Sequence, residues 1–138
     1  CRDRTSNGIG RRMNSGFLTG VTIAVGGAAG ALCRWGAVCL LLNAGHRPMI
    51  ATLGVNAAGS FLAGFLWFPT RNLSPIAADA LFIGFLGAFT TFSTFSLETI
   101  RLGAEGAYGI AALNIVLQNG LGLFAAALGF ALAHRLIA

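Results

Sequence analysis

The stretch Gly87-Ala-Phe-Thr-Thr-Phe-Ser-Thr-Phe-Ser96 lies inside an apolar run, residues 76–102, that is long enough to cross a lipid bilayer. Its middle carries five hydroxyl side chains, namely Thr90, Thr91, Ser93, Thr94 and Ser96. Irregular or polar backbone at membrane depth survives only where protein surrounds it or where it lines a wet cavity. Channels and transporters bind ions at interrupted membrane helices. The stretch therefore predicts a helix broken in mid-membrane and a role in ion transport.

The composition of the 138-residue chain is that of an integral membrane protein. Hydrophobic residues make up 56% and charged residues 9%, against about 25% charged residues in soluble domains. Glycine and small residues recur four apart, as at Gly26 and Gly30, which predicts closely packed membrane helices. We predict an all-α membrane protein with four transmembrane helices per chain, the third of them broken, at residues 17–42, 51–68, 76–102 and 109–134.

The first twelve residues differ from the rest of the chain. They are polar, they contain four of the nine arginines, and they precede Met13. We expect residues 1–12 to be a polar basic tail that is foreign to the natural protein or lies upstream of it, and residues 13–138 to form the four-helix membrane domain. The remaining arginines are scattered singly, so the net charge of +5 creates no basic face and predicts no nucleic-acid partner. Arginines beside a span set its orientation or contact lipid.

The loop arginines favour neither orientation if translation starts at Met13. Arg71 and Arg135 then lie on one side of the membrane, and Arg47 and Arg101 on the other. Because positive charge in short loops orients a chain, this balance allows insertion both ways, whereas counting the tail places the N-terminus inside. Four thin helices enclose little space, and a homodimer builds a pore more economically. We expect the pore to lie at or near a dimer interface.

Two predicted helices carry amides. Asn56 lies in the second span, with Ser60 one turn later on the same face. Its amide either joins two helices or contacts an anion through the NH₂ group. Asn114 and Gln118 are one turn apart in the fourth span, and they form either a polar track beside a pore or a hydrogen-bonded seam. The residues alone leave these alternatives open.

The expected break combines rings and freed backbone. Phe92 and Phe95 share a face of any helix that contains both. The positive edge of an aromatic ring attracts a small anion, and weak binding allows the release that conduction requires. At Gly87, Thr90 and Thr91 a break would free carbonyls that coordinate Na⁺, while the following helix N-terminus would attract anions. The alternative is a simple kink whose hydroxyls bond the preceding turn.

Few charges lie within the predicted spans. We expect Arg34 to snorkel from the first span into a vestibule. Glu98 follows the hydroxyl-rich stretch, and we expect it to form an ion pair with Arg34 or Arg101. The sequence has no Ser–His–Asp set, metal-ligand cluster or nucleotide motif, so we do not expect an enzyme.

Three strings carry a resemblance to a known family. They are Gly27-Ala-Ala-Gly-Ala-Leu-Cys-Arg34, Thr52-Leu-Gly-Val-Asn-Ala-Ala-Gly-Ser60 and Gly84-Phe-Leu-Gly-Ala-Phe-Thr-Thr-Phe-Ser-Thr-Phe-Ser-Leu-Glu98. From Met13 onward the chain resembles the CrcB/Fluc family of small fluoride channels, and the third string is the most specific. The resemblance implies a dual-topology, antiparallel homodimer with two pores in the bacterial inner membrane. Such channels passively expel fluoride that enters as HF.

The resemblance also implies a cation and a fourth-helix track. A structural Na⁺ at the centre of the dimer would be bound by the backbone carbonyls of Gly87 and Thr90, and Arg34 would lie at a vestibule. The fourth helix of the family often supplies hydroxyl residues beside the pore. This chain departs from that pattern with Asn114 and Gln118, whose amides donate hydrogen bonds as hydroxyls do.

For the fluoride pathway, the resemblance implies that the ion passes the edges of Phe92 and Phe95. Asn56 and a neighbouring hydroxyl, Ser93 or Thr94, would donate hydrogen bonds to it.

The residues also leave two other functions open. A proton-coupled exporter needs a buried carboxylate, for which Glu98 is the only candidate. A structural membrane factor would use the basic tail.

Overall fold

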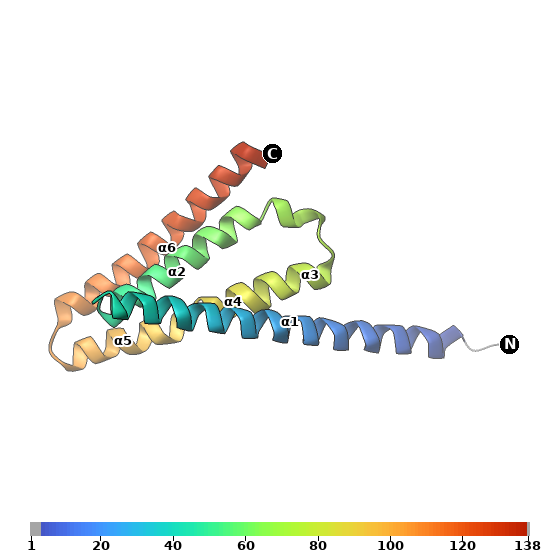
Figure 1. The fold of residues 1–138 in the computed structure, drawn as a ribbon, viewed down its shortest axis with the longest axis horizontal. Helices are drawn as coiled ribbons and strands as arrows, with labels where there is room; N and C mark the ends of the chain where they lie inside the picture. Colours follow the sequence, from blue (N-terminus) through green and yellow to red (C-terminus); the bar gives the residue numbers. More distant parts are fainter. Residues whose placement is uncertain (1–3, 138) are drawn as a thin grey trace.

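The computed structural model describes the backbone of residues 4–137 and the side chains of residues 16–137. Within these ranges every regular element is a helix (Figure 1). Four segments are long and apolar enough to cross a membrane: Gly16–Asn43, Pro48–Leu66, Pro75–Ala104 and Tyr108–Ile137. The predicted all-α architecture with four spans is therefore confirmed. Part of the predicted tail, residues 1–3, lies outside the described residues, and the start at Met13 stays a prediction.

The third span is built from several short pieces, whereas the other three spans are single helices. The elements are α1 (Arg4–Asn43), α2 (Pro48–Leu66), the 3₁₀-helix η1 (Pro69–Asn72), α3 (Pro75–Asp79), the π-helix η2 (Ala80–Leu86), α4 (Gly87–Phe89), α5 (Phe92–Ala104) and α6 (Tyr108–Ile137). Single π-turns inside a helix are rare overall, but those that occur lie frequently at functional sites. Here the π-helix leads directly into the turn before the break.

Two of the connections between spans are tight, and each contains a glycine with positive φ. After α1, Gly45 has φ of 85°, a conformation that other residues seldom adopt. The His46 N–H donates to the Leu41 carbonyl at 3.1 Å, and the Gly45 N–H donates to the Leu42 carbonyl at 2.9 Å. This Schellman arrangement satisfies carbonyls at the end of a helix. The turn after α5 repeats it around Gly106, so each pair of flanking spans is joined by a short reversal.

The spans pack as two pairs. Helix α2 packs mainly on α6, and α1 packs mainly along the π-helical part of the third span (Figure 1). Glycines allow both approaches: a Cβ atom on Gly64 would overlap the Ala126 carbonyl of α6, and one on Gly30 would overlap the Phe85 carbonyl of η2. The expectation of close glycine packing is confirmed at Gly30.

The interior is formed mostly by small and polar residues, with a few large apolar side chains such as Phe89 and Phe95, while many other large apolar side chains face outward. Ala51 and Ala133 are fully buried, whereas Phe17 and Leu123 are 76% and 74% exposed. In water such a surface would drive aggregation. In a bilayer it contacts hydrocarbon, and small residues inside let the helix backbones approach.

Candidate functional site

The third span is interrupted at Thr90 and Thr91, as predicted. Helix α4 ends at Phe89, both threonines have extended backbone, and α5 begins at Phe92. Gly87 lies in the last helical turn before the break rather than at the break itself. The interruption leaves the last carbonyls of α4 and the first amides of α5 in need of partners from elsewhere.

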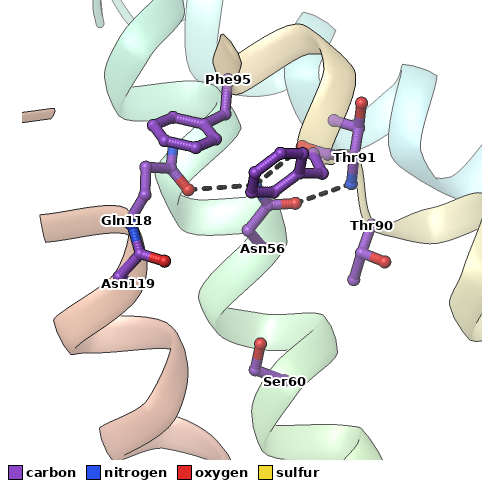
Figure 2. Close-up of a pocket in the computed structure, with 8 residues that line it drawn as sticks. Asn56, Ser60, Thr90, Thr91, Phe95, Gln118 and Asn119 are labelled. Atoms are coloured by element: carbon purple, nitrogen blue, oxygen red, sulfur yellow. Dashed lines mark hydrogen bonds between the residues drawn. The ribbon is translucent and has the colours of Figure 1, made fainter. Parts of the chain in front are cut away.

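Asn56 of α2 supplies two of those partners. The Thr91 N–H donates to Asn56 Oδ1 at 2.8 Å, and Asn56 Nδ2 donates to the Thr91 carbonyl at 3.0 Å (Figure 2). In a continuous helix the Thr91 N–H would donate to the carbonyl of Gly87, four residues earlier. The Asn56 side chain therefore replaces a helical hydrogen bond and leaves the Gly87 carbonyl without its helical donor.

Thr91 caps the N-terminus of α5, and the hydroxyl residues of the first turn of α5 gather around it. Thr91 Oγ1 accepts from the Thr94 N–H at 3.2 Å, which is the usual role of an N-cap threonine. The Thr91 hydroxyl also donates to Thr94 Oγ1 at 2.9 Å and lies 3.4 Å from Ser93 Oγ. Ser93 and Thr94 are exposed. Ser93 and Thr94, both predicted on the ion pathway, therefore lie beside the N-cap residue Thr91. They do not line the cavity that opens next to the break.

A cavity of about 220 Å³, which we name the break cavity, opens against the interruption. Residues from α2, the break, α5 and α6 line it: Asn56, Ser60, Thr90, Thr91, Phe92, Phe95, Gln118 and Asn119. Figure 2 shows their side chains gathered around Asn56, with the α6 residues on one flank and the break on the other. Polar and aromatic groups converge here, as in a small-ligand site.

Helix α6 contributes two buried amides that form hydrogen bonds to residues of other helices. Gln118 Oε1 accepts from Asn56 Nδ2 at 3.0 Å, and Asn114 Nδ2 donates to Thr99 Oγ1 at 2.9 Å. Asn114 is fully buried and Gln118 is 8% exposed. Gln118 Nε2 and Asn114 Oδ1 are buried without a hydrogen-bond partner among the described residues. Asn114 lies outside the break cavity, whereas Gln118 lines it.

Phe92 and Phe95 meet as their spacing predicted. Their ring centroids are 5.2 Å apart with an interplanar angle of 71°, an edge-to-face contact. Phe95 is 6% exposed and Phe92 is 74% exposed. The pair therefore forms one wall of the break cavity with one ring in the interior and the other open to the surroundings.

The two charged residues near the break take partners that the sequence did not predict. Arg34 is half-buried, and its Nη1 donates to the Thr90 carbonyl at 3.4 Å. Glu98 Oε1 accepts from the Thr52 hydroxyl at 2.8 Å, and its Oε2 is buried without a hydrogen-bond partner among the described residues. The expected ion pair of Glu98 with Arg34 or Arg101 is therefore wrong. A hydroxyl on another helix binds one oxygen of the carboxylate instead.

Sequence reasoning missed three residues of this region. Thr52 and Thr99 bind Glu98 and Asn114, and Asn119 lines the cavity beside Gln118. One signal was available, because Thr52 precedes Asn56 by one helical turn and shares its face. No comparable pattern marks Thr99, whose role depends on how α5 and α6 pack.

Comparison with known proteins agrees with this architecture. The model of the CrcB-like protein family, camphor resistance (CrcB), matches residues 21–130. A relative named fluoride-specific ion channel FluC, from Methylococcus capsulatus, is 48% identical over 83% of this chain and 52% of its own length. Relatives of the same name from Saccharophagus degradans and Parabacteroides distasonis are each 38% identical, over 85% and 83% of this chain and 90% and 92% of theirs. The chain thus spans about half of the first relative and most of the other two. It belongs to the CrcB-like protein family.

Proposed function

We propose that this chain is a fluoride-specific ion channel and not an enzyme. The support is the family, the name that its relatives carry at up to 48% identity, and the four membrane spans. One observation carries the proposal in this molecule. The third span stops at Thr90 and Thr91, and a cavity lined by amides and aromatic rings opens beside that interruption.

In the proposed pathway, the break cavity replaces part of the water around fluoride. Asn56 and Gln118 supply amide donors, and Phe92 and Phe95 supply ring edges, whose partial positive charge faces an anion. A fixed guanidinium at the same place would hold the anion more strongly. Weak donors permit both binding and release, as conduction requires. The proposed transport is passive, and it lowers the fluoride that accumulates in the cell after HF enters and dissociates.

The remaining predicted residues extend the pathway on either side of the cavity. Ser93 and Thr94 are exposed next to Thr91 and offer hydroxyls to an approaching ion. Asn114 continues the amide seam one turn before Gln118 on α6. Arg34 raises the positive potential near the break from the side of α1. We propose these four residues, together with Gln118, as the approach and the track of the ion pathway.

We propose that the working channel is an antiparallel homodimer with a structural Na⁺ between its subunits. Carbonyls at the break suit such an ion: the Thr91 N–H is taken by Asn56, so Gly87 keeps a carbonyl without its helical donor, and Gly87 is exposed. Unwound carbonyls of this kind bind Na⁺. The carbonyls of Gly87 and Thr90 would bind the ion, which would link the interrupted third span of one subunit to that of the other. The proposed location is the bacterial inner membrane, with lipid covering the outer faces.

The proposal is tested by efflux of fluoride from liposomes that contain the purified protein. Fluoride release should require only a path for compensating charge, should be indifferent to an imposed proton gradient, and should not be matched by chloride. Release that depends strictly on the proton gradient would favour an exporter. Absence of any fluoride release from correctly inserted protein would refute the function. Replacing Na⁺ with N-methylglucamine during purification should weaken the dimer if the proposed cation is present.

A further inference from the structure

The hydrogen bonds around Asn56 fix the direction in which its amide points. Asn56 Oδ1 faces the Thr91 N–H and Nδ2 faces the Thr91 carbonyl. Turning the amide over would set donor against donor and acceptor against acceptor, so the backbone at the break allows one orientation. The second N–H of Asn56 Nδ2 therefore always points toward α6, where Gln118 Oε1 receives it at 3.0 Å.

This contact satisfies only the oxygen of the Gln118 amide. Its oxygen accepts from Asn56, but its Nε2 is buried without a hydrogen-bond partner in the part of the chain that the structure describes, and the side chain is only 8% exposed. A buried donor without an acceptor is unfavourable. Figure 2 shows the Gln118 oxygen turned toward Asn56, within the cavity that both residues line. The Gln118 oxygen thus occupies the Asn56 N–H that an anion in this cavity would use.

We infer that Gln118 is a reversible amide that selects the anion. Without an anion, its carbonyl binds Asn56. When fluoride enters the break cavity, the Gln118 amide turns over about its last side-chain torsion, which has two nearly equivalent settings. Asn56 Nδ2 and Gln118 Nε2 then both donate to the ion, and the orphaned donor gains its acceptor. The inference rests on the proposed function and adds a selecting role for this residue.

Selectivity follows from the competition between the anion and the Gln118 carbonyl. An ion must accept hydrogen bonds better than a neutral amide oxygen to displace that oxygen from Asn56. Fluoride is small and concentrates its charge, so it is the strong acceptor among halides. Chloride spreads the same charge over a larger surface and fails to displace the carbonyl. The Gln118 carbonyl thus discriminates against any anion that cannot displace it from the Asn56 N–H.

Gln118 is the only glutamine in the chain, which allows a direct measurement. Protein made by cell-free synthesis with side-chain ¹⁵N-labelled glutamine gives one pair of amide N–H signals in nanodiscs. Titration with NaF should move these signals to positions typical of a strong hydrogen bond, and the same concentrations of NaCl should leave them in place. Signals that ignore fluoride, or that respond equally to chloride, would overturn the inference.

Flux measurements on the same preparation separate this inference from the proposed function. If wild-type liposomes release fluoride while the Gln118 signals stay unmoved, the channel stands and the amide reversal is wrong. If wild-type liposomes release no fluoride, the function itself fails. Gln118→Met should lower fluoride flux and the fluoride-to-chloride ratio by about tenfold or more, as expected for the loss of one hydrogen bond to an ion.

Leu123→Met is the control for that substitution. Leu123 lies on the same helix, is 74% exposed and does not line the break cavity. Its replacement should change the fluoride flux by no more than about twofold, the usual scale for substitutions away from critical contacts. Equal losses in both variants would contradict a special role for Gln118. The labelled wild-type protein decides the matter if Gln118→Met does not fold.

Discussion

The Asn56 side chain forms hydrogen bonds with both the N–H and the carbonyl of Thr91, as the backbone of a neighbouring β-strand would. The two hydrogen bonds, at 2.8 and 3.0 Å, satisfy an N–H and a carbonyl that the interrupted helix cannot satisfy itself. A single side chain of α2 therefore stabilises the extended backbone in the middle of the third span. The break is a stable element of the fold, and its stability depends on a residue 35 positions away.

Replacing this side chain should destabilise the break. Asn56→Leu leaves two backbone groups of Thr91 without partners, at about 1–3 kcal/mol each, and we expect a clear loss of thermal stability together with loss of fluoride flux. Asn119→Leu, on the exposed side of the same cavity, is the control and should melt like the wild type. Asn56→Asp keeps the acceptor for the Thr91 N–H but sets a negative charge in the path. We expect that variant to fold and conduct very slowly, and wild-type rates in liposomes would contradict the assignment.

The two cavity phenylalanines should respond differently. Phe92→Ile and Phe95→Ile both remove a ring edge, and each should slow fluoride efflux by about tenfold or more, a change that needs only about 1.4 kcal/mol. Phe95 is 6% exposed, so its replacement should also lower stability by about 1 kcal/mol. Phe92 is 74% exposed in the single chain and should show little stability loss. The measurement pairs efflux rates with thermal melting.

A ring far from the cavity provides the comparison for these variants. Phe124 on α6 is 64% exposed and does not line the break cavity. Phe124→Ile should leave both the efflux rate and the melting temperature close to wild type. A comparable slowing in Phe124→Ile would indicate that any lost ring disturbs the fold, and it would remove the pathway role from Phe92 and Phe95.

The packing of α1 on the third span depends on one glycine. In Gly30→Ala the new methyl group would overlap the Phe85 carbonyl, which is backbone and cannot rotate away. Overpacking of this kind costs about 1–3 kcal/mol. Gly36→Ala lies on the same helix with no atom within 4 Å of the added group, and it should be neutral or slightly stabilising. Denaturation in mixed micelles should rank the two variants in that order.

Glu98 separates a channel from a proton-coupled exporter. Its carboxylate accepts from Thr52, and the other acidic side chain within the described spans, Asp79, lies near the start of the third span. Glu98→Gln keeps an oxygen for Thr52 but cannot exchange protons. In a passive channel fluoride efflux should persist in this variant and stay insensitive to the proton gradient. Coupled exchange in the wild type that disappears in Glu98→Gln would establish the exporter instead.

Much of the fold was predictable because the bilayer restricts the possibilities. Length and hydropathy identified four spans, and hydroxyl residues in an apolar run identified the break that the structure places at Thr90 and Thr91. The π-helix before the break was not predicted. It packs against α1, where Gly30 admits the Phe85 carbonyl, and no local sequence pattern identifies residues 80–86 as the partner of α1.

The site was predictable in its members but less so in its contacts. Helical spacing placed Asn56 and Gln118 on polar faces, yet spacing cannot say that one amide receives the other's N–H. The ion pair expected for Glu98 failed for a similar reason. Opposite charges nearby in sequence suggested a partner, whereas the packing of α2 on α5 brought the Thr52 hydroxyl closer. Ser93 and Thr94 were predicted on the pathway, and their contacts with the N-cap residue Thr91 became apparent only from three-dimensional geometry.

The pairing of α2 with α6 has a consequence for biosynthesis. Gly64 and Gly129 each lie against the backbone of the opposite helix, so the two helices can close only after the ribosome has finished both. Membrane helices insert first and associate afterwards. During translation Asn56 can meet Thr91 before α6 exists, but Gln118 arrives only with the fourth span. The cavity is therefore completed after the break has formed, and a nascent chain arrested before α6 would hold a break with no opposite wall.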